Sequence, residues 1–377
     1  VTVGSGLMLR SLARLTSVDT GLDTDGVLVL RAAPPDGRYP DGTAFQEYYR
    51  QVLDRVRALP DVASAGAIHL LPGTRSNWSF PTYPEGVDYP EGTAVPSVNF
   101  RGVWPGYFET VGMRAVRGRL LQPSDDADAE KVVVVNQAFV DRFWPGLDPL
   151  GRTLRAFTRT GDAYRVVGVV GNVRQHGLAS EPRPEMYFTH RQWGWNMSFW
   201  IVARVRGAGT PMDHAAALQQ AVWSVDPDVP ITGLDALSHV FGETAATTRF
   251  LTLVLSSFGA LALLLGAVGV FGVTAYAVGR RAPEFGVRLA LGSSRSGVLA
   301  AALATCLAPV AAGLGAGLAL AGAASGALRS VLYGVEPSDP VTFAMVAATL
   351  LGVAILASLL PAWRASRVDP VEVLNAE

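Results

Sequence analysis

The segment RRAPEFGVRLALGSSRSGVL, residues 280–299, decides how this chain folds, because it separates two long apolar runs. It carries four arginines and one glutamate. No Asp, Glu, Lys, Arg or His occurs in the runs on either side, residues 250–278 and 298–327, or in a third run, 341–363. Each run exceeds the roughly 18 residues that indicate a transmembrane helix. Burial of three such runs inside one soluble core is the weaker alternative, so we predict three transmembrane helices.

The arginines in the connecting segments predict the orientation of these helices. The 279–297 segment has four arginines against one acid, and the segment after residue 363 begins with two more. The 328–340 segment has one arginine and two acids. Short loops rich in Lys and Arg stay in the cytoplasm. We therefore expect a cytoplasmic 279–297 segment and C-terminus, and a large extracytoplasmic domain over residues 15–245.

Composition limits the remaining possibilities. The chain has 377 residues, enough for two or more domains, and a net charge of −1, which argues against a nucleic-acid partner. Its single cysteine, Cys306, lies in an apolar run, so the chain forms no internal disulfide and a zinc cluster is improbable. The apolar start VTVGSGLML fits the end of a truncated transmembrane helix, the end of a signal sequence or a soluble strand. We favour the truncated helix, over residues 1–14.

The extracytoplasmic domain contains two β-α-β patterns. GVLVLRAA and VASAGAIHLLP flank the amphipathic helix AFQEYYRQVLDRVRALPDV, and SFWIVARVR and VPITGL flank PMDHAAALQQAVWSVD. Two such units predict a ferredoxin-like α+β fold. Residues 100–195 between them read as an inserted β-rich subdomain, with strands KVVVVN and YRVVGVVG and the helix NQAFVDRFW.

Sequence signals for enzymatic chemistry are lacking. The five histidines have no metal-ligand spacing, and DDADAE at 125–130 lacks the spacing of a calcium loop. Neither a GxSxG motif nor a phosphate-binding GxxxxGK[ST] motif occurs. The aromatic segments WPGYF and RQWGWNMSFW leave a sugar-binding or peptide-binding face open, although packing is the favoured use. The apolar runs carry no ionisable residue that could form an ion pathway, so we interpret the membrane part as a mechanical element.

Residues 283–292 have the pattern of a short helix at the cytoplasmic surface. Pro283 suits its first turn, Glu284 lies near the positive end of its dipole and pairs with Arg288, and Gly292 ends it. Phe285 and Leu289 would share one exposed face. That face is suited to a protein partner, or alternatively only to anchoring in the lipid interface.

This segment resembles the R-R-x-x-E-I-G-I-R-x-A-L-G-A signature of MacB/FtsX-type permeases, the membrane subunits of type VII ABC transporters. Similar matches to the family occur in VWPGYFETVGMRAVRGRLL, VVVVNQAFVDRFWPGLDPLGRTL and PAWRASRVDPVEVLNAE, so the resemblance covers almost the whole chain. In that family the signature forms the coupling helix that docks on the ATPase. The resemblance assigns this role to Pro283, Glu284, Phe285, Gly286, Arg288, Leu289, Ala290, Leu291 and Gly292.

The resemblance also implies an architecture and a set of partners. It implies a MacB-like periplasmic core domain over residues 15–245, an FtsX-like permease domain over 246–377, and a four-helix membrane unit in the bacterial inner membrane. The chain would be a non-enzymatic permease of the acidobacterial type that works by mechanotransmission, in efflux or in lipoprotein or macrolide-type export. A separate ATPase would bind the ATP, so this chain needs no cofactor.

Further partners follow from the same resemblance. They are a second permease copy or fused half, and a periplasmic adaptor with an outer-membrane channel. An FtsX-like regulator that activates periplasmic cell-wall hydrolases without transport is the main alternative, and a membrane-anchored sensor or adhesin is the third. The substrate is not indicated by any part of the sequence.

Overall fold

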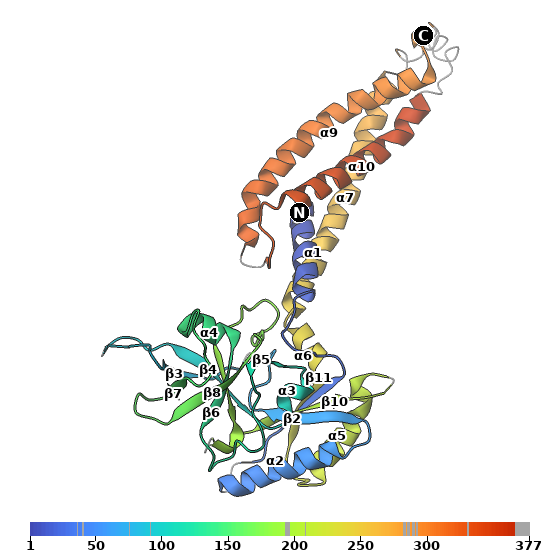
Figure 1. Ribbon diagram of the computed structural model, residues 1–377. Coiled ribbons are helices and arrows are strands. Elements are labelled where there is room, and N and C mark those ends of the chain that lie inside the picture. Colours follow the sequence, from blue (N-terminus) through green and yellow to red (C-terminus); the bar gives the residue numbers. More distant parts are fainter. Residues whose placement is uncertain are drawn as a thin grey trace. The chain divides into compact units, whose positions relative to one another are not determined.

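The computed structural model describes residues 1–365 apart from 36, 40, 75, 91, 193–196, 208, 282–283, 285–286, 289–290, 292 and 330–331. The chain divides into two compact units. The sheet unit comprises residues 18–245, and the helical unit comprises residues 1–17 together with those from 246 onward (Figure 1).

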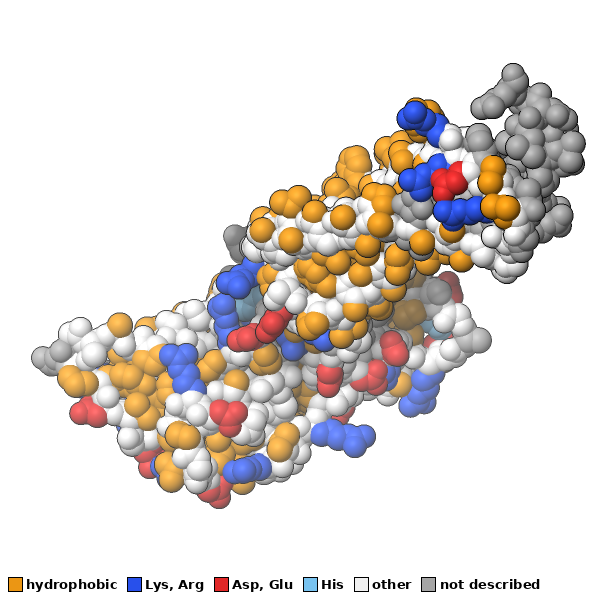
Figure 2. Space-filling view, turned by 90° about the horizontal axis from the view of Figure 1, so that it is seen from above, with side chains coloured by type: hydrophobic (Ala, Val, Ile, Leu, Met, Phe, Trp, Pro, Cys, Tyr) orange, Lys and Arg blue, Asp and Glu red, His pale blue; other side chains and the backbone are white. Residues whose placement is uncertain are grey.

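Among the residues that the structure describes, three helices of the helical unit are long and apolar enough to cross a membrane, namely α7, the 308–325 part of α9, and α10. At about 1.5 Å per residue, the 35 residues of α7 extend for about 50 Å, more than the roughly 30 Å of a bilayer core. Figure 2 shows hydrophobic side chains over much of this unit's surface. The main helices of the unit are α1 (Thr2–Thr16), α7 (Ala246–Arg280), α9 (Arg295–Ser325) and α10 (Pro340–Ala365), and α9 is followed by the short η3 (Gly326–Leu328).

The N-terminal segment is helical, so the soluble-strand alternative is wrong. Helix α1 packs closely on α7, where the Ser5 hydroxyl donates to the carbonyl oxygen of Leu255 at 2.5 Å. A Cβ added at Gly259 would lie 2.6 Å from the Ser5 Oγ, so a side chain there would displace the Ser5 hydroxyl from its present position.

The connection between α9 and α10 is tied to α1 by polar contacts. Arg10 forms an ion pair with Asp339, and the backbone N–H of Tyr333 donates to Ser11 Oγ at 2.7 Å. Asp339 also accepts from the backbone N–H of Thr342 at 2.9 Å, which caps the first turn of α10.

The GxxxG spacing of Gly313 and Gly317 in α9 favours close packing on another helix over a mere bias in composition, but no other helix among the described residues of this chain packs closely at these two positions. A Cβ added at Gly313 or Gly317 meets no atom within 4 Å. These two glycines instead line an apolar cavity of about 350 Å³ between α1, α7, α9 and α10. The helices do not pack closely at these positions, so the small side chains leave a gap between them.

The sheet unit contains one eleven-stranded sheet, ten of whose strands run in the order β11-β1-β10-β2-β4-β3-β7-β8-β6-β9, while β5 pairs with β8. The first part of this order, strands β11, β1, β10 and β2, confirms the predicted ferredoxin-like fold. Among these four strands β1 and β10 are central, neighbouring strands are antiparallel, and each β-α-β unit contributes two strands. The elements of this part are β1 (Val27–Ala32), α2 (Gly42–Arg57), β2 (Val62–Ile68), β10 (Phe199–Val205), η2 (Pro211–His214), α5 (Ala215–Trp223), β11 (Ile231–Ala236) and α6 (Leu237–Glu243).

Helices α2 and α5 share a core with one face of these strands (Figure 1). Asp41 caps α2 by accepting from the backbone N–H of Ala44 at 2.6 Å. Tyr49 is completely buried on α2, where its hydroxyl donates to the Ala32 carbonyl at 2.6 Å and accepts from the Phe199 N–H at 2.9 Å. One side chain therefore ties α2 to the ends of β1 and β10.

The remaining strands form the inserted β-rich part. It joins the ferredoxin-like strands where β4 pairs with β2, and β4 also runs parallel to β9. The strands and helix predicted from KVVVVN, YRVVGVVG and NQAFVDRFW occur as β6, β8 and α4. The elements of the insert are β3 (Ser79–Pro84), β4 (Ser97–Val103), α3 (Tyr107–Thr110), β5 (Ala115–Gly118), β6 (Val132–Asn136), α4 (Gln137–Phe143), β7 (Thr153–Ala156), β8 (Ala163–Val170), β9 (Glu185–Thr189) and η1 (His190–Gln192).

Candidate functional site

The first candidate is the segment between α7 and α9, for which the family resemblance implies a role in ATPase coupling. Glu284 and Arg288 form an ion pair at 2.6 Å, and both side chains are about half exposed. Such a pair adds only about 0.3–0.5 kcal/mol, so it positions charge rather than holding the fold together. Ser294 is the N-cap of α9, and its hydroxyl oxygen accepts a hydrogen bond from the backbone N–H of Gly297 at 3.1 Å.

Three of the nine predicted coupling residues lie among the described residues. Leu291 is 82% exposed, and the neighbouring Val287 is 45% exposed. The segment therefore presents apolar side chains beside the Glu284–Arg288 pair. The other predicted coupling residues lie outside the described residues, namely Pro283, Phe285, Gly286, Leu289, Ala290 and Gly292.

A second candidate lies in the sheet unit, in the loop of residues 172–178, which we call the clamp loop. The backbone N–H of Arg174 donates to the Thr20 carbonyl at 3.1 Å, and that of Leu178 donates to Thr244 Oγ1 at 3.2 Å. Thr20 follows α1 by four residues, and Thr244 precedes α7 by two. The clamp loop thus bonds to both connections that leave the sheet unit.

Two glycines allow these close approaches. A Cβ at Gly21, whose φ is +81°, would lie 2.0 Å from the carbonyl oxygen of Asn172. A Cβ at Gly177, whose φ is +100°, would lie 2.6 Å from the Cβ of Thr244. Both positions combine a left-handed backbone with a contact that admits no side chain. Larger residues there would force the clamp loop away from the two connections.

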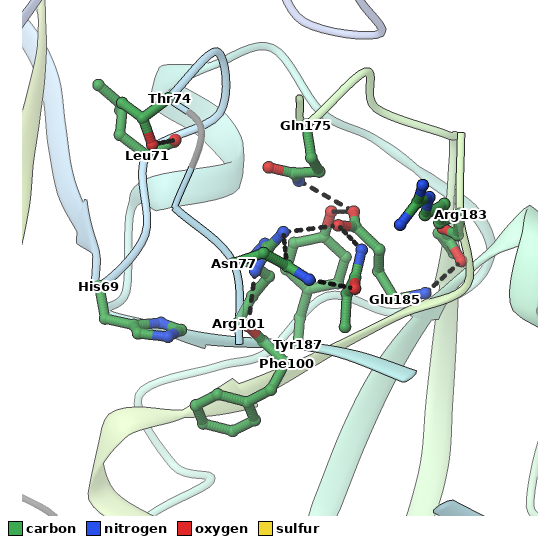
Figure 3. A network of polar contacts seen from close by, with 12 residues as sticks. His69, Leu71, Thr74, Asn77, Phe100, Arg101, Gln175, Arg183, Glu185 and Tyr187 are labelled. Atoms are coloured by element: carbon green, nitrogen blue, oxygen red, sulfur yellow. Dashed lines mark hydrogen bonds and ion pairs between the residues drawn. The ribbon is translucent and has the colours of Figure 1, made fainter. Parts of the chain in front are cut away.

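Behind the clamp loop lies a buried network of polar side chains from β4, β9 and two loops (Figure 3). Glu185 accepts from Gln175 Nε2 at 2.9 Å and from the Tyr187 hydroxyl at 2.8 Å, and it pairs with Arg101 at 3.1 Å. The Arg101 and Glu185 side chains are 1% and 0% exposed. Arg101 also donates to Asn77 at 3.1 Å. The network anchors the clamp loop, through Gln175, to the parallel β4–β9 pair.

Burial governs the electrostatics of this region. Removal from water raises the pKa of Glu185, while Arg101, Gln175 and Tyr187 act in the opposite direction by stabilising the carboxylate. Nearby, burial first and Arg101 second lower the pKa of His69 to about 3. His69 is therefore neutral at physiological pH. Its Nδ1 accepts from the Gly102 N–H at 2.8 Å, so its proton lies on Nε2.

Sequence reasoning did not identify the clamp loop or the network. The available signal was one charged residue in each of two otherwise uncharged strand sequences, SVNFRGV and EMYFT. A lone charge in a buried strand indicates a partner, but it does not say which one. Among the described residues, no group of three or more His, Cys, Asp or Glu side chains is arranged to hold a metal ion.

Comparisons with known proteins agree with this organisation. Residues 2–222 match the model of the MacB-like periplasmic core domain, and residues 256–370 match that of the FtsX-like permease C-terminal domain. The macrolide export ATP-binding/permease protein MacB of Agrobacterium fabrum is 28% identical over 309 residues, which are 78% of this chain and 46% of that protein. MacB of Bartonella henselae is 26% identical over 76% of this chain and 44% of its own length. The chain thus spans less than half the length of these relatives.

Solved structures give matches of lower similarity. The periplasmic region of MacB from Actinobacillus actinomycetemcomitans aligns with 62% of this chain at 15% identity, over 98% of that region, with a TM-score of 0.41. The extracellular domain of the noncanonic ABC-type transporter YknZ aligns with 54% of this chain at 16% identity, over 94% of that domain, with a TM-score of 0.36. The family assignment rests on the sequence models, the first of which covers more than half of the chain. The protein therefore belongs to the MacB/FtsX-type permeases of ABC transporters.

Proposed function

We propose that this chain is an export permease that transmits motion from a cytoplasmic ATPase to its extracytoplasmic domain. The clamp loop carries the proposal. One loop bonds to the connections after α1 and before α7, at Thr20 and Thr244, so displacement of either helix end would pull on the same loop. The buried network then passes that displacement into β4 and β9, because its charged members cannot separate without leaving a buried charge unpaired.

The composition of the helices supports the same proposal. The windows of α7, α9 and α10 that are long enough to span a membrane are strongly apolar, and ionisable residues of the kind that mark an ion pathway do not occur in residues 250–278, 298–327 or 341–363. Uncharged helices suit the transmission of motion better than the passage of ions. The segment around Glu284 and Arg288 is the proposed entry point for the ATPase, and the clamp loop is the proposed exit.

Partners and substrate class follow as parts of the proposal. A separate ATPase would bind ATP, a second copy or fused half would complete the permease, and a periplasmic adaptor with an outer-membrane channel would receive the exported molecule. The macrolide export proteins that resemble this chain support export as the direction of transport. The hydrolase-activating alternative has no comparable support.

The test measures motion rather than transport, so it requires no known substrate. In a Cys306→Ser background, a spin label at Arg117→Cys reports the distance between two copies in nanodiscs with the co-purified ATPase. Arg117 is exposed on β5. We expect ATP binding to change this distance. Gly177→Ala should abolish the change while ATP hydrolysis continues, because the added Cβ collides with Thr244. Combining Glu284→Lys with Arg288→Glu should also abolish the distance change, because these substitutions alter the proposed entry point of the motion.

Gly171→Ala is the matched control for the clamp loop. A Cβ at Gly171 meets no atom within 4 Å, and its backbone is not left-handed. This variant should behave as the wild type does. The proposal fails if Gly177→Ala and Gly171→Ala give the same ATP-dependent distance change, or if ATP changes no distance in the wild type.

A further inference from the structure

The sheet unit contains a cavity of about 590 Å³ that the coupling proposal does not use. It lies where β1 and β2 end and β10 begins, and part of its wall is formed by Ala33, Pro34, Pro35, Gly37 and Tyr39. Its size falls within the range of about 300–1,000 Å³ that is typical of small-molecule sites. The cavity includes Met197, Ser198 and Trp200 from RQWGWNMSFW, the aromatic segment for which the sequence left a binding face open.

Aromatic side chains form much of the wall. Trp78 is 42% exposed, and its ring packs edge-on against those of His69 and Phe80, with ring centroids 5.5 and 6.4 Å apart. The ring of Trp200 lies against the backbone of β11, because a Cβ at Gly233 would be 2.3 Å from its Cη2. Tyr39 is held in place by its hydroxyl, which donates to Asp226 Oδ2 at 2.8 Å. The apolar wall is therefore preformed rather than assembled around a ligand.

Arg31 is the only charged side chain among the described residues that line the cavity. It is exposed, and its Nε and Nη2 donate to Ser198 Oγ at 3.1 and 2.6 Å. The Ser198 hydroxyl thereby holds the guanidinium at the cavity wall. Ser76 adds another hydroxyl to the lining. The described lining thus offers a fixed positive charge and hydrogen-bonding hydroxyl groups beside an aromatic surface.

We propose that this cavity binds a small amphipathic anion, with a carboxylate or equivalent oxyanion on Arg31 and an aromatic or branched apolar body against Trp78, Trp200 and Tyr39. A guanidinium makes charge-assisted bonds with oxyanions, which are about twice as strong as neutral hydrogen bonds. A cationic ligand would be repelled by Arg31. The described lining residues supply no carboxylate to accept the several hydroxyl donors of a neutral sugar. This inference concerns binding alone and does not depend on the coupling proposal.

Two matched probes test the proposal, indole-3-propionate and its neutral amide, indole-3-propionamide. Saturation-transfer NMR would measure their affinities for the full chain in nanodiscs of zwitterionic lipid, with empty nanodiscs as the baseline. We expect the acid to bind about five- to tenfold more tightly than the amide. Arg31→Gln should remove this preference, and Arg31→Lys should retain part of it. Trp78→Ala should weaken both probes alike.

Arg117→Gln provides the matched control, because Arg117 is also an exposed arginine of the sheet unit but does not line the cavity. Its preference for the acid should equal that of the wild type. Equal affinities of acid and amide for the wild type would overturn the proposal. So would an Arg31→Gln protein that is folded, as judged by an unchanged melting temperature, and still prefers the acid.

Discussion

Arg101 and Glu185 illustrate how single residues stiffen the sheet unit. Their side chains are almost completely buried, so each needs the other as a partner, and Gln175 and Tyr187 satisfy further acceptor positions of the carboxylate. Removing one partner of such a pair typically costs about 3–5 kcal/mol, whereas replacing both with apolar residues costs less. The pair therefore contributes more to specifying how β4 and β9 meet than to net stability.

His69 gives this region a predictable dependence on pH. Its pKa is about 3 in the folded chain, against about 6.5 when unfolded, because burial and Arg101 disfavour its charged form. Below pH 6.5 the unfolded state binds one more proton at this position than the folded state does. Stability is therefore lost as pH falls, by up to about 1.4 kcal/mol per pH unit. His190, whose pKa burial also lowers to about 3, adds a similar slope.

His69→Gln isolates the contribution of one residue. Glutamine cannot titrate in this range, but its carbonyl oxygen can still accept from the Gly102 N–H that His69 now binds. Thermal unfolding between pH 7.5 and 5 should show a shallower loss of stability with falling pH in the variant. The difference in slope should be about that contributed by one titrating proton. A variant as sensitive to acid as the wild type would show that His69 is not the source.

At the scale of elements, the crossing of α1 and α7 depends on Gly259. An added side chain there meets Ser5 at 2.6 Å, while one added at Gly313 of α9 meets nothing within 4 Å. Gly259→Leu should therefore destabilise the helical unit by about 1–3 kcal/mol through overpacking. Gly313→Leu changes the same residue type but projects into the apolar cavity, so it should be neutral or stabilising.

Thermal unfolding in detergent would compare these two variants directly. Both exchange a helical glycine for leucine, so any gain in helix propensity is common to them and cancels in the comparison. The expected result is a lower midpoint for Gly259→Leu than for Gly313→Leu. Equal midpoints would mean that the close contact between α1 and α7 does not contribute to stability.

The elements that the sequence predicted are those with a local signal. The three apolar runs correspond to α7, α9 and α10, and the alternating or apolar segments around α2 and α5 correspond to β1, β2, β10 and β11. Helix α2 followed its periodicity closely, with Val52 and Val56 fully buried. Length, hydropathy and period are sufficient for such elements because each is encoded within a few consecutive turns or strands.

The parts that were missed depend on contacts between distant residues. The clamp loop was not predicted because Arg174 and Thr20 lie far apart in the sequence and meet only in the folded domain. The surroundings of Gly313 and Gly317 could not be predicted because a GxxxG spacing describes one helix and not its neighbour. For the predicted coupling segment, the structure confirms the Glu284–Arg288 pair, but its role toward an ATPase remains a prediction.

At the scale of the whole molecule, the proposed function requires one membrane topology. The segments on either side of α9 differ in charge, with four arginines in 279–297 and one in 328–340. That difference predicts opposite sides of the membrane for the two segments. The sheet unit, which connects α1 to α7, should lie on the same side as 328–340. An ATPase in the cytoplasm could then reach the arginine-rich 279–297 segment and the C-terminus, but not the 328–340 segment.

Single cysteines in a Cys306→Ser background test this topology. Ser296, Ser338 and Thr160 are exposed and lie in the two segments and the sheet unit respectively. A membrane-impermeant maleimide should label Ser338→Cys and Thr160→Cys in intact spheroplasts, and it should label Ser296→Cys only after permeabilisation. Labelling of Ser296→Cys from outside would place the coupling segment where no cytoplasmic ATPase can bind it. The Glu284–Arg288 pair could not then be the entry point, because the motion would have to begin on the other side of the membrane.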